Sequence, residues 1–197
     1  MSFFLLPDSS HRRSIRLKRY DYTQPGAYFV TLLAWRRECL FGELVGDDVQ
    51  LSEAGRVLEY YWNTLPAHFS VKIDQWVIMP NHFHGIIWLI DDPVRAKQPG
   101  KNVSSVDICI SGRFALTGSA ENPPHGTASG SLGAIIQNFK SNTAREINRL
   151  RQTPGHSVWQ RNYYDHIIRN EDELINTRLY ILDNPRQWVE DEHNIQI

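Results

Sequence analysis

Apolar residues recur along this chain with two periods, one typical of strands and one typical of helices. Residues 27–35 follow a Pro25-Gly26 turn and are rich in aromatic and β-branched side chains, which predicts a strand. Residues 71–79 and 82–90 predict two more strands, paired as a hairpin around Pro80-Asn81. A fourth strand is expected over residues 159–169.

Three segments carry apolar residues at helical spacing. The first helix is expected over residues 53–65, capped by Ser52 and stopped by Pro66. The second is expected over residues 132–150, and the third over residues 171–184, with acidic residues in its first turn and Pro185 at its end. The order β-α-β-β-α-β-α predicts an α+β fold: a ferredoxin-like split β-α-β sheet with an added C-terminal helix.

Length and composition predict one domain over residues 1–197, because 197 residues that are 41% hydrophobic suffice for a sizeable core. Residues of about 91–130 depart from this pattern, with several Pro and many Gly and Ser. We interpret them as a long flexible insertion, with a short strand at 106–110 as one possibility. Its role is expected to be filler, and contact with a substrate is the alternative.

The net charge is small, but the charged residues are distributed unevenly along the chain. The formal net charge of −1 gives no general affinity for polyanions, but an N-terminal arm of about residues 1–22 is strongly basic. Such an arm suits a phosphate backbone, or it is a solvated tail. Further basic residues lie outside the apolar stripe of the 132–150 helix. The candidate phosphate contacts are therefore Arg12, Arg13, Arg16, Lys18, Arg19, Lys140, Arg145 and Arg149.

The two cysteines, Cys39 and Cys109, lie far apart and form no C-x-x-C pair, which favours a reducing cytosol over a disulfide framework. The apolar stretch at residues 3–6 is too short for a signal-peptide core, and the longest apolar run is far below a membrane span. A cytoplasmic protein without a membrane partner is expected.

Candidate chemistry gathers in two places. His82 and His84 stand two apart in a predicted strand, so their imidazoles share one face and could hold one divalent ion. Two partly exposed histidines on a sheet are the plainer interpretation. Tyr180 and Asn184 lie one helical turn apart on a common face of the last helix. A structural role for Tyr180, with its ring buried and its hydroxyl solvated, is the default alternative.

Four separated sequence blocks follow one another along the chain: residues 76–84 (WVIMPNHFH), Trp159-Gln160, residues 163–169 (YYDHIIR) and residues 180–185 (YILDNP). This series resembles the single-tyrosine transposases of the HUH superfamily, most closely the REP-associated tyrosine transposases, over about residues 15–90 and 131–190. The resemblance implies an antiparallel HUH-type sheet, metal ligands at His82, His84 and Asn184, and a nucleophile at Tyr180. It also implies Mg²⁺ or Mn²⁺ as cofactor, single-stranded or hairpin DNA with short inverted repeats as partner, and a homodimer.

Phosphodiester cleavage by a tyrosine needs help at phosphorus, because a phenol with a pKa near 10 is a weak nucleophile at neutral pH. A metal at the histidines would polarise the phosphate, and attack would leave a 5′-phosphotyrosine that can be rejoined to another strand. His166, in the third block, is expected to be structural or to contact DNA. Two other functions remain open: a non-catalytic DNA-binding protein of the same fold, and a metal-dependent hydrolase or RNA-binding module in which Tyr180 is structural.

Overall fold

The computed structural model describes residues 20–91 and 128–188. Within these ranges the elements, in chain order, are β1 (Gly26–Leu33), the 3₁₀ turn η1 (Trp35–Arg37), β2 (Gly42–Val45), β3 (Asp48–Leu51), α1 (Glu53–His68), β4 (Val71–Ile78), β5 (His82–Leu89), α2 (Leu132–Leu150), β6 (Tyr164–Ile168) and α3 (Glu171–Asp183). None of the helices in these ranges is long and apolar enough to cross a membrane.

The main sheet has the strand order β4-β5-β1-β6, and every neighbouring pair is antiparallel. β5 lies between β1 and β4, which α1 connects, so the β-α-β unit is split by the strand that carries both histidines. This is the ferredoxin-like arrangement that the sequence predicts, with α3 added after the last strand.

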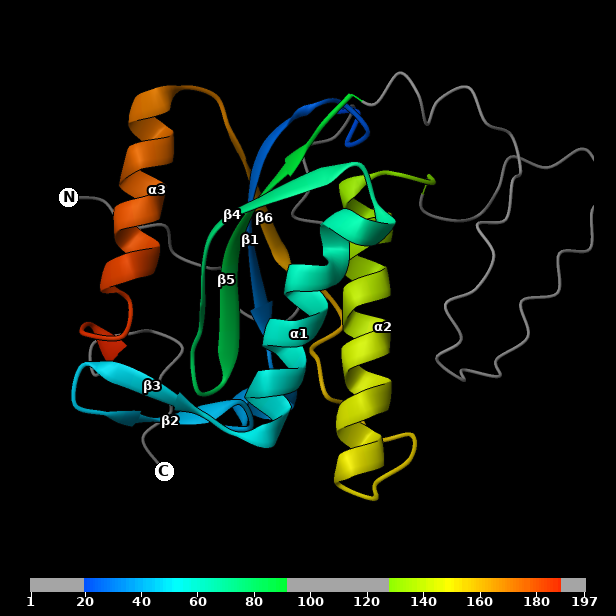
Figure 1. Cartoon of the computed structure of the whole chain (residues 1–197), viewed down its shortest axis with the longest axis vertical. Helices are drawn as coiled ribbons and strands as arrows, with labels where there is room; N and C mark the ends of the chain where they lie inside the picture. The colour runs from blue at the N-terminus through cyan, green and yellow to red at the C-terminus, as the bar shows by residue number, and fades with distance from the viewer. Residues whose placement is uncertain (1–19, 92–127, 189–197) are drawn as a thin grey trace, which may run out of the picture.

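The sheet separates two unequal layers of helices (Figure 1). α1 and α2 pack side by side on one face, and α3 lies alone among the described elements on the other. The alternation of side chains along β1 matches this division. Tyr28, Val30 and Leu32 belong to the larger buried cluster beneath α1 and α2. Ala27 and Phe29 belong to a smaller cluster that includes Leu174 and Ile181 of α3.

Helix α1 begins as predicted, because the Ser52 hydroxyl accepts a hydrogen bond from the Gly55 amide at its N-terminus. The prediction that Pro66 stops the helix is wrong. α1 continues to His68, and the Phe69 amide still donates to the Leu65 carbonyl. Pro66 has no amide hydrogen, so the helix loses one hydrogen bond at this position. Because Pro66 lies close to the end of the helix, the loss of this one bond does not prevent the helix from continuing.

A second small sheet, the hairpin of β2 and β3, was not predicted. Its two strands have four residues each and alternate in exposure, joined through Gly46, which has a φ of 65°, and Asp47. The predicted strand over 159–169 is too long. Only Tyr164–Ile168 pairs continuously with β1, and Trp159 forms a single bridge with Ala34.

Two predictions fall on residues that the structure does not describe. The basic arm, from Arg12 to Arg19, precedes the described residues. Most of the expected insertion, including the short strand proposed at 106–110, lies in the gap between residues 91 and 128.

Candidate functional site

The two histidines lie together on the face of the sheet that α3 covers. His82 and His84 are both buried at the start of β5, and their ring centroids are 4.5 Å apart. His84 Nδ1 is 2.8 Å from the hydroxyl of Thr31, its cross-strand partner on β1. His82 Nδ1 is 2.8 Å from Asn81 Oδ1. Since both Nδ1 atoms are engaged with the protein, Nε2 is the atom that each ring can offer to a metal ion.

Tyr180 extends from α3, the helix that covers this face of the sheet, toward the same pair of histidines. Its hydroxyl lies 3.4 Å from His84 Nε2, although the two residues are 96 positions apart in the sequence. Its ring meets His84 edge-on, with centroids 5.3 Å apart, and also touches Phe29 beneath it. The side chain is 42% exposed, so solvent or a ligand can reach the phenol.

Asn184 caps the C-terminus of α3 one turn beyond Tyr180 and is almost fully buried. Two contacts bracket it: Tyr180 lies against His84, and Trp188 stacks on His82 with ring centroids 5.8 Å apart. The segment from 180 to 188 therefore runs along the histidine pair with Asn184 between its two contact points. Within the described structure, Asn184 Oδ1 is buried and accepts no hydrogen bond.

The buried oxygen gives a test of whether the residues present suit a divalent ion. A buried amide oxygen without a donor is costly and calls for an explanation, and a bound cation is one. Two imidazole nitrogens and one amide oxygen form a set that Mn²⁺ accepts readily and Mg²⁺ accepts with phosphate oxygens and water in its other positions. No group of three His, Cys, Asp or Glu residues that could hold an ion occurs in the described ranges. The donor set thus fits the predicted ion and depends on Asn184 as its third member.

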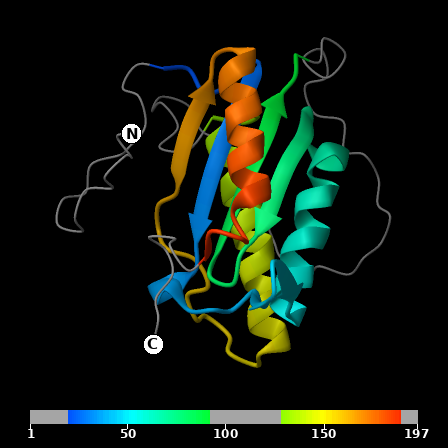
Figure 2. The ribbon, with the colours of Figure 1, turned by 90° about the vertical axis from the view of Figure 1, so that its left-hand side faces the viewer.

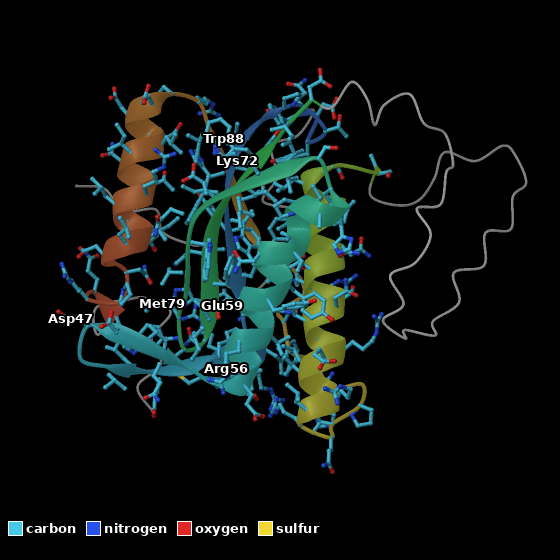
Figure 3. All side chains as sticks on the ribbon, viewed as in Figure 1. Asp47, Arg56, Glu59, Lys72, Met79 and Trp88 are labelled. Atoms are coloured by element: carbon cyan, nitrogen blue, oxygen red, sulfur yellow. The ribbon has the colours of Figure 1, made fainter. Side chains whose placement is uncertain are left out.

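An ion pair across the layers anchors α3 near Tyr180. The guanidinium of Arg178 donates to both carboxylate oxygens of Asp74 on β4, at 2.9 and 2.6 Å. The Trp88 indole also donates to this carboxylate, at 2.9 Å, and Figure 3 labels Trp88 on the sheet. The hydrogen bonds from Arg178 and Trp88 lower the pKa of Asp74 to about 2 against the opposing effect of its burial. This ion pair, called here the Asp74–Arg178 clamp, holds α3 to the sheet two residues before Tyr180.

The N-terminus of α3 is fixed separately. Asn170 caps the helix by accepting from the Glu173 amide. The Glu173 carboxylate accepts from the Arg169 amide and lies 2.5 Å from His166 Nε2. The Arg169 amide and then His166 hold the pKa of Glu173 below its usual range. His166 thus has a partner on α3, which favours the structural one of the two roles expected for it, structural or DNA-contacting.

The predicted phosphate contacts on α2 differ from one another. The Lys140 ammonium donates to the carbonyls of residues 160–162, at 2.6 to 3.3 Å, and burial lowers its pKa to about 8. Its charge is engaged within the protein, which argues against a phosphate contact. Arg145 and Arg149 are exposed on the same helix, and Arg149 pairs with Glu146. α2 covers the face opposite Tyr180, so neither arginine lies at the candidate site.

The geometry brings Tyr180 against the two histidines that the sequence singled out, and Asn184 lies buried in the segment between Tyr180 and Trp188, which contact His84 and His82. Sequence reasoning missed Thr31 and Asn81, the partners of the two imidazoles. Asn81 directly precedes His82 and was within reach of local reasoning. Thr31 is fixed by strand register, which no local pattern reveals.

Comparison with known proteins adds relatives of two kinds. No family model matches the chain. A solved structure, that of a REP-associated tyrosine transposase bound to a REP hairpin, is similar with a TM-score of 0.53 and 17% sequence identity, covering 88% of this chain and 74% of that one. An uncharacterized protein of Haemophilus influenzae is 37% identical over 183 residues, which are 92% of each chain. The chain belongs to the same family as this Haemophilus influenzae protein, and its fold is that of the REP-associated tyrosine transposase.

Proposed function

We propose that this protein is a DNA transposase of the single-tyrosine, REP-associated type, which cleaves and rejoins single-stranded or hairpin DNA. The observation that carries the proposal is the 3.4 Å approach of the Tyr180 hydroxyl to His84 Nε2, two residues that lie 96 positions apart in the sequence. The shared fold, found in a protein that was solved with a REP hairpin, supports the choice of DNA. Short inverted repeats are the expected target.

In the proposed reaction Tyr180 is the nucleophile. Its oxygen forms a bond to the scissile phosphorus while the bond to the 3′-oxygen breaks. The phenol gives its proton to solvent, and the leaving 3′-oxygen takes one up. The products are a 5′-phosphotyrosine and a free 3′-hydroxyl. No water is consumed, so a second 3′-hydroxyl can reverse the step and join a different strand.

The proposed ligands of one Mg²⁺ or Mn²⁺ are His82 Nε2, His84 Nε2 and Asn184 Oδ1. When bound, the ion polarises the phosphate oxygens and stabilises the negative charge that develops there. The chain's own residues orient the reactants. Thr31 and Asn81 hold the imidazoles, and the Asp74–Arg178 clamp holds the helix that presents Tyr180. In this proposal, the exposed arginines of α2 and the basic N-terminal arm contact phosphates that lie farther from the scissile bond.

The proposal includes a homodimer formed through the outer face of α3. Ile175, Leu179 and Leu182 repeat at helical spacing on that face and are all exposed. An antiparallel pairing with a second copy, centred on Leu179, would set the acidic first turn opposite Arg186 of the other copy. The surface is therefore complementary to itself in both apolar character and charge, which an isologous interface requires. DNA is a poor occupant of an apolar face with an acidic end.

Tyr180→Phe tests the proposed chemistry, because it removes the hydroxyl and keeps the ring. The parent, incubated with labelled hairpin DNA and Mg²⁺ or Mn²⁺, is expected to form an adduct that survives denaturing electrophoresis. Tyr180→Phe should form none while its affinity for DNA stays close to that of the parent.

The matched controls are Tyr163→Phe and Tyr164→Phe, which should both keep the adduct. An adduct that persists in Tyr180→Phe and maps to one of these residues would contradict the assignment. Tight DNA binding without any adduct, across hairpins that carry the repeats flanking the gene, would instead favour the non-catalytic DNA-binding protein.

A further inference from the structure

The turn that follows β1 has an unusual backbone. In η1, Arg36 and Arg37 both adopt left-handed conformations, with φ of 54° and 57°. Such conformations are unfavourable for side chains other than glycine, asparagine and aspartate, and two in succession are rare. Strained backbone of this kind persists where the surroundings hold it and is concentrated at functional sites.

Backbone hydrogen bonds hold the turn rigidly against the start of β5. The Ala34 amide donates to the Asn81 carbonyl at 2.8 Å, directly beside His82. The Trp35 amide donates to the Val158 carbonyl at 2.8 Å, and the Arg37 and Glu38 amides close the turn at 3.0 and 3.2 Å. Figure 2 shows the end of β1 and the turn after it at the same end of the sheet as the C-terminal part of α3, which carries Tyr180.

Trp35 lies at the end of β1 that pairs with the start of β5, where the histidines are. Thr31 lies opposite His84, and Leu33 lies opposite His82. Ala34 continues the extended chain, with φ −60° and ψ 151°, and is buried in the cluster beneath α1 and α2. Trp35 follows directly, two positions beyond Leu33, the strand partner of His82. Its indole is 41% exposed, which is high for a tryptophan.

The charge beside Trp35 is positive. Arg36 is exposed, and in the described part of the chain no acidic side chain forms an ion pair with it. An exposed aromatic ring next to a guanidinium is the combination by which proteins hold single-stranded nucleic acid, with a base stacked on the ring and a phosphate beside the cation. Paired bases inside a duplex offer no free face to such a ring, so the feature fits a single strand.

From these observations we infer that the turn Trp35–Arg37 is a binding site for single-stranded DNA next to the candidate catalytic centre. Trp35 stacks on an unpaired base, and Arg36 contacts a phosphate of the same strand. The inference rests on the proposed function, and it goes further by assigning the unpaired flank of the hairpin to this surface. The hydrogen-bonded turn fixes the backbone that carries both side chains before DNA arrives, which lowers the entropy lost on binding.

The first test compares two DNA probes: a hairpin with an unpaired flank of several nucleotides, and the same hairpin with a blunt end. With the full-length protein and Mg²⁺, Trp35→Ala should weaken binding of the flanked hairpin by about 5- to 150-fold, the usual effect of losing one stacked base. Binding of the blunt hairpin should change little. Trp35→Phe, which keeps a stacking ring, should restore much of the affinity, and Tyr60→Ala, which removes an exposed ring from α1, should have no effect.

The second test separates binding from folding. Arg36→Gly removes the cation and places glycine where the backbone favours it, so the melting temperature should be no lower than that of the parent. The same variant should weaken binding of the flanked hairpin and reduce the slope of log affinity against log salt by about 0.7. Weaker binding by a protein of equal or greater stability would show that the arginine serves the ligand and not the fold.

Four outcomes would overturn the inference. One is a parent that forms the Tyr180 adduct while Trp35→Ala binds the flanked hairpin as well as the parent does; this leaves the proposed function standing. Another is equal weakening for both probes, which would place the turn on the duplex. A third is a change in oligomeric state on Trp35→Ala with unchanged DNA affinity, which would make the turn a protein interface. A parent that binds neither probe would overturn the inference and the proposed function together.

Discussion

Single residues decide how each imidazole of the candidate site is presented. The Thr31 hydroxyl and the Asn81 amide each engage an Nδ1 atom, so the rings of His84 and His82 cannot rotate without losing a buried hydrogen bond. That the two histidines share one strand face was predictable from the strand period. The approach of Tyr180 to them was expected only from the family resemblance, because the two segments lie 96 positions apart. The roles of Thr31, Trp35 and Asp74 were not predictable, since they depend on register and on contacts between distant segments.

Thr31→Val tests the role of the hydroxyl, since valine has nearly the same shape without the hydroxyl group. His84 should lose its fixed orientation, and affinity for Mn²⁺, measured by calorimetry, should fall by about 10- to 100-fold. Thr64→Val is a matched control, because that hydroxyl donates to the Tyr61 carbonyl on α1, far from the site. Equal Mn²⁺ affinities for the parent and Thr31→Val, with both proteins folded, would show that the Thr31 hydroxyl does not position a ligand.

At the scale of elements, the helices and the four strands of the main sheet followed from hydrophobic period and capping. The errors have identifiable physical causes. The hairpin of β2 and β3 escaped notice because each strand is only four residues long, although Gly46-Asp47 between two alternating runs is a recognised turn signal. The fourth strand was predicted too long because Trp159 is an aromatic residue of a kind common in strands. Trp159 is buried, but it forms only an isolated β-bridge with Ala34.

The attachment of α3 to the sheet depends on pH in a predictable direction. The pKa of Asp74 is about 2 in the folded protein and about 3.9 in an unfolded chain. The folded pKa is the lower of the two, so the ionised carboxylate stabilises the fold fully above about pH 4. This stabilisation is lost as the pH falls from about 4 through 2.

Arg178→Ala should remove the main cause of this shift and cost about 2 kcal/mol at neutral pH, the usual range for hydrogen bonds to a charged group. Urea titrations at pH 7, 4, 3 and 2 should show a shallower loss of stability on acidification than in the parent. Arg149→Ala, which breaks an exposed pair with Glu146, should change the stability far less. A parallel pH dependence in Arg178→Ala and the parent would contradict the assignment.

At the scale of the whole molecule, the two faces of the sheet differ in how they are covered. Two helices cover one face, whereas α3 covers the other and turns an apolar stripe outward. Arg186 lies 3.7 Å from Asp47 at the tip of the β2–β3 hairpin, labelled in Figure 3, and both side chains are mostly exposed. Such a pair is weak, so Arg186 remains able to meet an acidic group of a second copy.

The proposed dimer predicts a specific cross-link. In a Cys39→Ser/Cys109→Ser background, Leu179→Cys should form a disulfide-linked dimer on mild oxidation, because the symmetry axis passes near this residue. Tyr60→Cys on α1 should not. Asp172→Arg should weaken the dimer in sedimentation, and adding Arg186→Glu should restore it by exchanging the charges. A parent that stays monomeric at high concentration, with no cross-link at residue 179, would exclude this interface.

The division of the buried residues into two clusters also bears on how the molecule opens. The larger cluster, beneath α1 and α2, does not include the side chains by which α3 packs on the sheet. We therefore expect α3 to detach as one cooperative unit at a free energy below that of global unfolding, leaving β1 and β5 paired. In such a partly open molecule both histidines remain in register on their strand while the tyrosine is withdrawn. The proposed nucleophile and the histidines that would hold the ion thus belong to regions of different local stability, and the proposed strand cleavage would require the two regions to be docked.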